Sequence, residues 1–116
     1  MKILIVDDSS FFKKNLVRML EKLGHESISL DSGNECLEQI TSLQVDVILM
    51  DWNMPGLSGL ETLIELGKQE VETPVIMMTA QSDMDQIMEA MDNNAHDYII
   101  KPFEAESLAE KLDSLP

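Results

Sequence analysis

Short apolar runs alternate along the whole chain with stretches in which apolar residues recur at helical spacing. The short runs predict five strands at residues 3–6, 27–30, 47–50, 75–78 and 98–100. Three of the runs are continuously apolar, which is typical of strands buried on both faces of a sheet. The stretches between them predict amphipathic helices. Their apolar stripes are Phe12, Leu16, Met19, Leu20 and Leu23; Cys36, Leu37, Ile40 and Leu43; Leu60, Leu63 and Ile64; Met84, Ile87, Met88 and Met91; and Leu108, Leu112 and Leu115.

Five strands, each followed by a helix, form a (βα)5 pattern. This pattern predicts an α/β fold with a doubly wound, five-stranded parallel sheet and helices on both of its faces. Gly24 is expected to end the first helix, and the last helix to run almost to Pro116. We expect Cys36 to pack in the core. We also expect core packing, rather than an adaptable docking surface, for the methionines of the fourth helix, Met84, Met88 and Met91.

The composition fits one globular domain. The chain has 116 residues, of which 44% are hydrophobic and 26% charged, so we expect a single domain over residues 1–116 without an output domain. No apolar run exceeds four residues, which predicts neither a membrane span nor a signal peptide. The single cysteine allows no internal disulfide, and we expect a cytoplasmic location.

The net charge excludes several classes of partner. Eight basic residues against 22 acidic residues give a formal charge of −14. Binding to nucleic acid requires a basic face, so DNA and RNA are not expected as ligands. Anionic membrane surfaces are disfavoured for the same reason. After Lys68 the only basic residues are Lys101 and Lys111, so a base in this acidic segment, Lys101 in particular, invites a functional explanation.

Polar side chains follow four of the five predicted strands in a suggestive order. Asp7 and Asp8 follow the first strand, Asp51 the third, Thr79 the fourth and Lys101 the fifth. The ligand site of an open α/β sheet lies at the carboxyl ends of its strands. We therefore expect three carboxylates, a hydroxyl and an ammonium group to gather at one edge of the sheet.

Clustered carboxylates repel one another unless a cation occupies the site, and oxygen ligands suit Mg2+, with Mn2+ as an alternative ion. An aspartate can also act as a nucleophile and form an aspartyl phosphate. Taken singly, each of these residues is explained more simply by a strand end, a helix cap or a turn, as is Asp31 after the second strand. Together they predict a Mg2+-dependent phosphoryl acceptor.

Four segments of the chain resemble the response-regulator receiver domain of two-component signalling. They read ILIVDDS at 3–9, MDWNMPG at 50–56, PVIMMTA at 74–80 and YIIKPF at 98–103. The resemblance extends from Lys2 to about Leu115, and it implies the flavodoxin-like strand order 2-1-3-4-5.

The resemblance implies a role for each site residue. Asp51 would accept a phosphoryl group from the phosphohistidine of a histidine kinase. Mg2+ would be held by Asp7, Asp8, Asp51 and the main-chain carbonyl of Asn53. Lys101 would pair with Asp51 or with its phosphoryl group.

The resemblance also implies a conformational switch built from Thr79 and Tyr98. The hydroxyl of Thr79 would move toward the phosphoryl group, and the ring of Tyr98 would turn inward. A half-buried tyrosine with its hydroxyl in water is the simpler alternative for Tyr98. The peptide bond between Lys101 and Pro102 is often cis in this family.

The region of the fourth helix, fifth strand and fifth helix is strongly acidic. Two such surfaces would repel one another, so we expect a monomer whose acidic output face binds a target of basic character. A flagellar motor component is one such target, which would make the chain a stand-alone switch of chemotaxis type. A solvated surface without a partner is the alternative. The acidic residues are Asp83, Asp85, Glu89, Asp92, Asp97, Glu104, Glu106, Glu110 and Asp113.

Other functions stay open. The chain can be a receiver excised from a longer regulator, or a phosphorelay carrier. A small-molecule phosphatase using an aspartyl phosphate is disfavoured, because such enzymes use an Asp-x-Asp pair and a cap, whereas Asp7 and Asp8 are adjacent. We therefore expect a phosphoacceptor and not an enzyme. Gln81 stands where chemotaxis regulators typically have Glu, which leaves the action of a partner phosphatase open.

Overall fold

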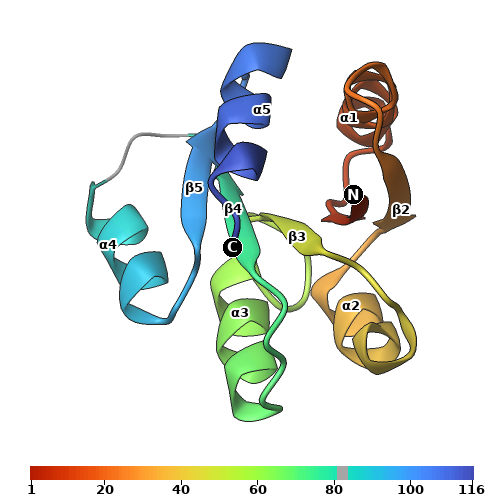
Figure 1. Cartoon of the computed structure of the whole chain (residues 1–116). Coiled ribbons are helices and arrows are strands. Elements are labelled where there is room, and N and C mark those ends of the chain that lie inside the picture. The colour runs from red at the N-terminus through yellow and green to blue at the C-terminus, as the bar shows by residue number, and fades with distance from the viewer. Residues whose placement is uncertain (81–83) are drawn as a thin grey trace.

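The computed structural model describes residues 1–80 and 84–116, and these form a five-stranded parallel sheet with helices on both faces (Figure 1). The sheet order is β2-β1-β3-β4-β5, as the resemblance implied, and the five predicted strands are confirmed to within a residue at each end. The strands are β1 (Lys2–Val6), β2 (Glu26–Leu30), β3 (Val47–Asp51), β4 (Val75–Thr79) and β5 (Asp97–Ile100).

The helices begin at polar caps that the sequence supplies. Ser9 and Ser32 accept hydrogen bonds from the first turns of α1 and α2, and Ser58 forms a reciprocal capping box with Glu61 at the start of α3. Gly24 follows α1 with a φ of 85°, as expected of a helix stop. The helices are α1 (Ser10–Lys22), α2 (Gly33–Gln39), the 3-10 helix η1 (Ile40–Ser42), α3 (Gly59–Lys68), α4 (Met84–Asp92) and α5 (Ala105–Asp113).

Helix α5 is shorter than predicted. It ends at Asp113, whereas the apolar stripe had suggested a helix almost to Pro116. Leu115 still packs against the core, although it lies beyond the last helical turn. The apolar stripe therefore predicted the burial of Leu115 correctly but did not predict where the helix ends.

The sheet separates two hydrophobic cores. Leu4 and Val6 of β1 belong to the core that α2, α3 and α4 cover, whereas Ile3 and Ile5 belong to the core that α1 and α5 cover. This alternation is the two-residue period of a strand buried on both faces. Cys36 is completely buried in the first core, which confirms its packing role.

The expectation of core packing for the methionines of α4 is wrong. Met84, Met88 and Met91 are 61%, 57% and 42% exposed, whereas Ile87 and Ala90 of the same helix are buried. Ile87 and Ala90 are three residues apart and form the buried stripe of α4. The methionines lie on the remaining face, so α4 presents large apolar side chains to solvent.

Within the described residues, no helix is both long and apolar enough to cross a membrane.

Candidate functional site

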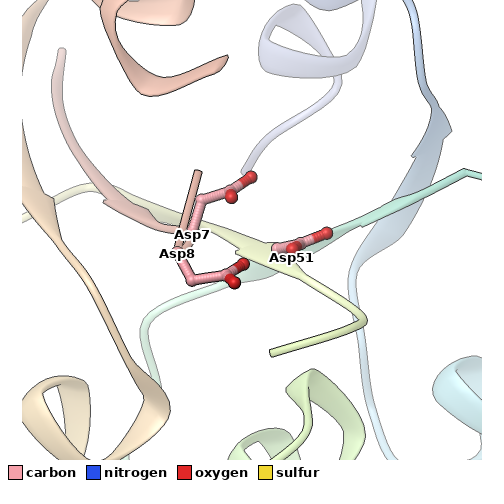
Figure 2. A group of neighbouring side chains, drawn as sticks. All are labelled: Asp7, Asp8 and Asp51. Atoms are coloured by element: carbon pink, nitrogen blue, oxygen red, sulfur yellow. The ribbon is translucent and has the colours of Figure 1, made fainter. Parts of the chain in front are cut away.

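Three carboxylates meet at the carboxyl end of the sheet. Asp7 and Asp8 follow β1, and Asp51 is the last residue of β3, the neighbouring strand (Figure 2). One oxygen of each side chain lies within 4.8 Å of the others, and Asp7 and Asp51 are buried while Asp8 is exposed. Among the residues that the structure describes, this is the one such group of acidic, histidine or cysteine side chains.

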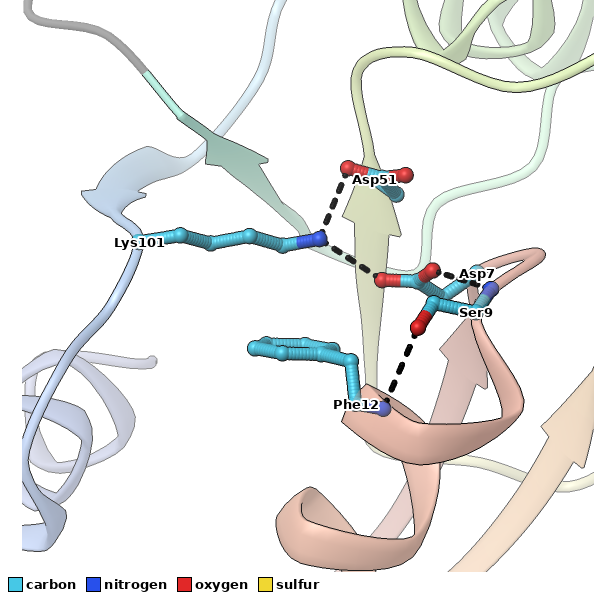
Figure 3. Close-up of polar contacts among 5 residues, drawn as sticks. All are labelled: Asp7, Ser9, Phe12, Asp51 and Lys101. Carbon is cyan, nitrogen blue, oxygen red and sulfur yellow. Dashed lines mark hydrogen bonds and ion pairs between the residues drawn. The ribbon is translucent and has the colours of Figure 1, made fainter.

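Lys101 reaches this cluster from the segment after β5. Its Nζ donates hydrogen bonds to Asp7 Oδ2 at 2.8 Å and to Asp51 Oδ1 at 3.0 Å (Figure 3). The backbone N–H of Lys101 donates to the carbonyl of Thr79 at 2.7 Å, which ties the lysine to the end of β4. The ammonium group thus bridges two of the three carboxylates.

The first turn of α1 holds Asp7 and Lys101 in place. The N–H of Ser9 donates to Asp7 Oδ1 at 2.8 Å, and the N–H of Phe12 donates to Ser9 Oγ at 3.2 Å. The ring of Phe12 lies under the ammonium group of Lys101, with 4.0 Å between Nζ and the ring centroid, a favourable cation–π geometry. The sequence analysis assigned Phe12 to an apolar stripe and did not predict its contact with Lys101. A single helical position can both pack against the core and contact the site, and the sequence pattern indicates only the first.

The electrostatics of the site leave an excess of negative charge. Burial raises the pKa of the Asp51 carboxyl, and the charges of Asp7 and Asp8 raise it further, while Lys101 opposes both effects. Three carboxylates face one ammonium group, so the cluster favours an additional cation or a proton.

This donor set fits Mg2+. The cluster offers hard oxygen ligands from carboxylates, which Mg2+ prefers, and the negative charge that Lys101 leaves uncompensated would offset the dehydration of the ion. Asp7, Asp8 and Asp51 are the side chains that could hold it. Asn53, the source of the expected fourth ligand, lies two residues after Asp51 in the exposed loop between β3 and α3.

Thr79 and Tyr98 border the same closely packed region, together with Trp52 and Met77. Thr79 is buried at the end of β4, and Tyr98 is half-buried on the adjacent strand. The two proposed switch residues are therefore neighbours in space. The Lys101–Pro102 peptide bond is cis, as expected. Gln81 lies outside the described residues.

A family comparison identifies the arrangement. The family model described as "Response regulator receiver domain" matches residues 3–113. The chain is a receiver domain. It belongs to the family whose motifs the sequence resembles, and the fold agrees with that membership.

Relatives of this receiver domain include proteins of similar length and much longer proteins. The chain is 36% identical to "Chemotaxis protein CheY" of Pseudomonas aeruginosa, over 99% of this chain and 95% of the relative. It is 38% identical to "DNA-binding transcriptional regulator NtrC" of Klebsiella pneumoniae, over 94% of this chain but 23% of the relative. The solved structure of Vibrio cholerae chemotaxis protein CheY4 superposes with a TM-score of 0.91 at 29% identity, covering 99% and 98% of the two chains.

The sequence analysis did not predict the ion pairs of Lys13 and Lys111. Asp31, interpreted as an ordinary turn residue, pairs with Lys13, a buried residue of α1. Lys111 pairs with Asp97 at 3.0 Å and lies over the ring of Tyr98, 4.8 Å from its centroid. Neither pair has a sequence signal, because the partners are 18 and 14 residues apart.

Proposed function

We propose that this receiver domain is a phosphorylation-activated switch that accepts a phosphoryl group on Asp51 from the phosphohistidine of a histidine kinase. The observation that carries the proposal is the meeting of Asp7, Asp8 and Asp51 with Lys101 at one edge of the sheet. Family membership supports the same chemistry.

The transfer breaks the P–N bond of the phosphohistidine and forms a P–O bond to a carboxylate oxygen of Asp51. The imidazole nitrogen leaves with the electron pair of the broken bond and takes up a proton. Lys101 fixes the carboxylate through its Oδ1 and neutralises charge on the incoming phosphoryl group.

Asp7, Asp8, Asp51 and the carbonyl of Asn53 would hold the metal. A bound Mg2+ supplies Lewis-acid stabilisation of the phosphoryl oxygens. Because the residues provide both the nucleophile and the charge compensation, the protein acts as its own substrate. We therefore propose a phosphoacceptor and not an enzyme that turns over small phosphoesters.

Thr79 and Tyr98 would convert the phosphoryl group into a change of surface. They border the same closely packed region as Trp52, so a movement of the Thr79 hydroxyl would open space for the Tyr98 ring. The change is a population shift, because the phosphoryl group stabilises the arrangement that contacts it better.

The α4-β5-α5 face is the proposed target surface. The exposed methionines of α4 add adaptable apolar contacts to it, and Lys111, one of its few bases, is already paired. We propose a monomer that binds a target of basic character, in a stand-alone role of chemotaxis type. Asp83, which was counted with this face, lies outside the described residues. The partial coverage of NtrC keeps a receiver of a longer regulator as the second candidate.

Trp52 allows the switch to be observed directly. It is 7% exposed and adjoins Asp51, so its fluorescence should respond first to Mg2+ and then to acetyl phosphate. The Asp51→Asn variant should lose the second response. A Mg2+ response without a donor response in the wild type would argue against phosphoryl acceptance from small donors. No response to either, in a protein that circular dichroism shows to be folded, would overturn the site assignment.

A further inference from the structure

Gly59, the first residue of α3, packs directly on the backbone of the proposed acceptor. A Cβ at this position would overlap the carbonyl oxygen of Asp51 and would lie 2.9 Å from the carbonyl carbon of Asp51 and from Met77 Cε. Real Cβ atoms essentially never come within 3.0 Å of such neighbours. In the same place, the N–H of Gly59 donates to the carbonyl of Trp52 at 2.8 Å.

The lack of space for a side chain, and not the conformational freedom of glycine, explains why position 59 is a glycine. Gly59 does not adopt the positive φ that favours glycine, whereas Gly24 and Gly56 do. Ser58 caps the helix with its own side chain, so the capping geometry does not require a glycine at the next position. What Gly59 alone permits is the close approach of α3 to the end of β3.

This close approach holds the two ends of the loop between β3 and α3 together. The loop begins directly after the acceptor, Asp51. The chain leaves β3 at Asp51, passes Asn53, and returns at Gly59 to bond the residue after the acceptor. Both the Asp51 backbone and the Trp52 carbonyl, one residue before Asn53, are thus fixed against the first turn of α3. A larger residue at position 59 would displace these groups relative to Lys101, which reaches the site from the segment after β5.

We propose that Gly59 is a positioning residue for phosphoryl transfer: by lacking a side chain it lets α3 hold Asp51 and its loop in register with Lys101 and the metal ligands. The inference rests on the proposed function, and it adds a residue that touches neither the phosphoryl group nor the metal. A displacement of about 1 Å at a reacting atom costs on the order of 100-fold in rate, which sets the expected effect of Gly59→Ala.

Two other glycines supply matched controls. Gly67 lies in the same helix with nothing within 4 Å of its Cβ position, so Gly67→Ala controls for the altered helix propensity. A Cβ at Gly33 of α2 would overlap Thr62 Oγ1 on α3 and would lie 3.3 Å from the Cβ of Leu57 in the loop before α3. Gly33→Ala therefore strains the packing of α3 and of Leu57 from the side of α2, without placing an atom against Asp51.

The test compares the three alanine variants with the wild type. It measures the free energy of unfolding, the dissociation constant for Mg2+, and the rate of phosphorylation by acetyl phosphate at saturating Mg2+, followed by intact mass. Gly59→Ala should lose about 100-fold in the phosphorylation rate and should bind Mg2+ more weakly. Gly67→Ala and Gly33→Ala should keep the wild-type rate, even though Gly33→Ala loses stability.

A Met77→Leu change in the Gly59→Ala background separates packing from positioning. It removes the contact with Met77 Cε at little cost in volume but leaves the overlap with the Asp51 carbonyl. Stability should recover in part while the rate stays low. A rate that recovers together with stability would show that Gly59 matters only for packing.

The outcomes distinguish this inference from the proposed function. A wild-type rate in Gly59→Ala, or an equal loss in Gly33→Ala, would overturn the role of Gly59 while leaving Asp51 as the acceptor. A wild type that neither acetyl phosphate nor a phosphorylated histidine kinase can modify would contradict the proposed function, and the Mg2+ dissociation constants would then decide the role of Gly59 alone.

If Gly59→Ala does not fold, amide hydrogen exchange in the wild type gives the answer. Mg2+ binding should slow exchange at the Gly59 N–H, because it stabilises the loop that this N–H closes, and it should leave the Gly67 N–H unchanged. Equal exchange at Gly59 with and without bound Mg2+ would reject the positioning role.

Discussion

Asp51 carries a charge that its surroundings disfavour. Burial, Asp7 and Asp8 raise its pKa above the ordinary value of 3.8. The folded state therefore binds this proton more tightly than the unfolded state, and stability falls as pH rises from 3.8 through the raised pKa. At pH values above the raised pKa of Asp51, the full loss in the free energy of unfolding remains.

Without Mg2+, Asp51→Asn should consequently be more stable than the wild type at neutral pH and no more stable near pH 3. Lys101 keeps Asp7 as a partner in the variant, so no ammonium group is stranded. Chemical denaturation at several pH values measures the difference. A variant that is less stable than the wild type at neutral pH would contradict the repulsion that we infer at the site.

Lys101 compensates two carboxylates, one of them wholly buried. Its loss in Lys101→Ala leaves Asp7, which is 0% exposed, without an ammonium partner. Removing one partner from a buried pair costs about 3 kcal/mol in the free energy of unfolding, and Mg2+ should restore part of that loss.

Lys111→Ala is the matched control for Lys101→Ala. The Lys111–Asp97 pair is more exposed, with side-chain exposures of 30% and 24%, so its loss should cost less than about 1 kcal/mol. Urea titrations with and without Mg2+ compare the two variants. Equal losses would mean that the carboxylate cluster does not depend on Lys101.

At the scale of the element, α4 has two apolar faces with different roles. Ile87 is buried against the sheet, whereas Met88 is 57% exposed. Ile87→Ala should therefore cost about 3 kcal/mol, while Met88→Gln should change the free energy of unfolding by less than about 0.5 kcal/mol. Thermal or urea denaturation would reveal an error in this assignment if Met88→Gln were the more damaging change.

The elements show what periodicity can and cannot predict. The strands were predictable because continuous apolar runs such as residues 47–50 have few alternatives in a chain of this pattern. The apolar stripe of Met84, Ile87, Met88 and Met91 predicted a helix correctly, but of these four residues only Ile87 is buried. Methionine and isoleucine look alike to a hydrophobicity pattern, and only the packing of α4 on the sheet makes Ile87 the inner residue.

At the scale of the molecule, charge argues against self-association. The chain has a formal charge of −14, and within the described part of the α4-β5-α5 face Lys111 is paired with Asp97. Light scattering should give the mass of a monomer both without and with a beryllofluoride mimic of the phosphoryl group. A dimer in the presence of the mimic would contradict the proposed role of this face.

The main site residues were predictable from the strand order, whereas the contacts that support them were not. Parallel strands end at the same edge, so Asp7, Asp51 and Lys101 had to meet once the order was known. The cation–π contact of Phe12 and the packing of Gly59 on Asp51 depend on how helices sit on the sheet. A linear pattern does not encode that relation, because it involves side-chain volumes from distant segments.

The central claim is that Asp51 accepts a phosphoryl group in the presence of Mg2+, and intact-protein mass spectrometry tests it most directly. We would incubate the wild type and Asp51→Asn with acetyl phosphate and Mg2+, and then treat half of each sample with hydroxylamine, which cleaves acyl phosphates. The account predicts the mass of one added phosphoryl group in the wild type, its loss with hydroxylamine, and no addition to Asp51→Asn. A hydroxylamine-sensitive phosphoryl group on Asp51→Asn would contradict the account, because another residue would then be the acceptor.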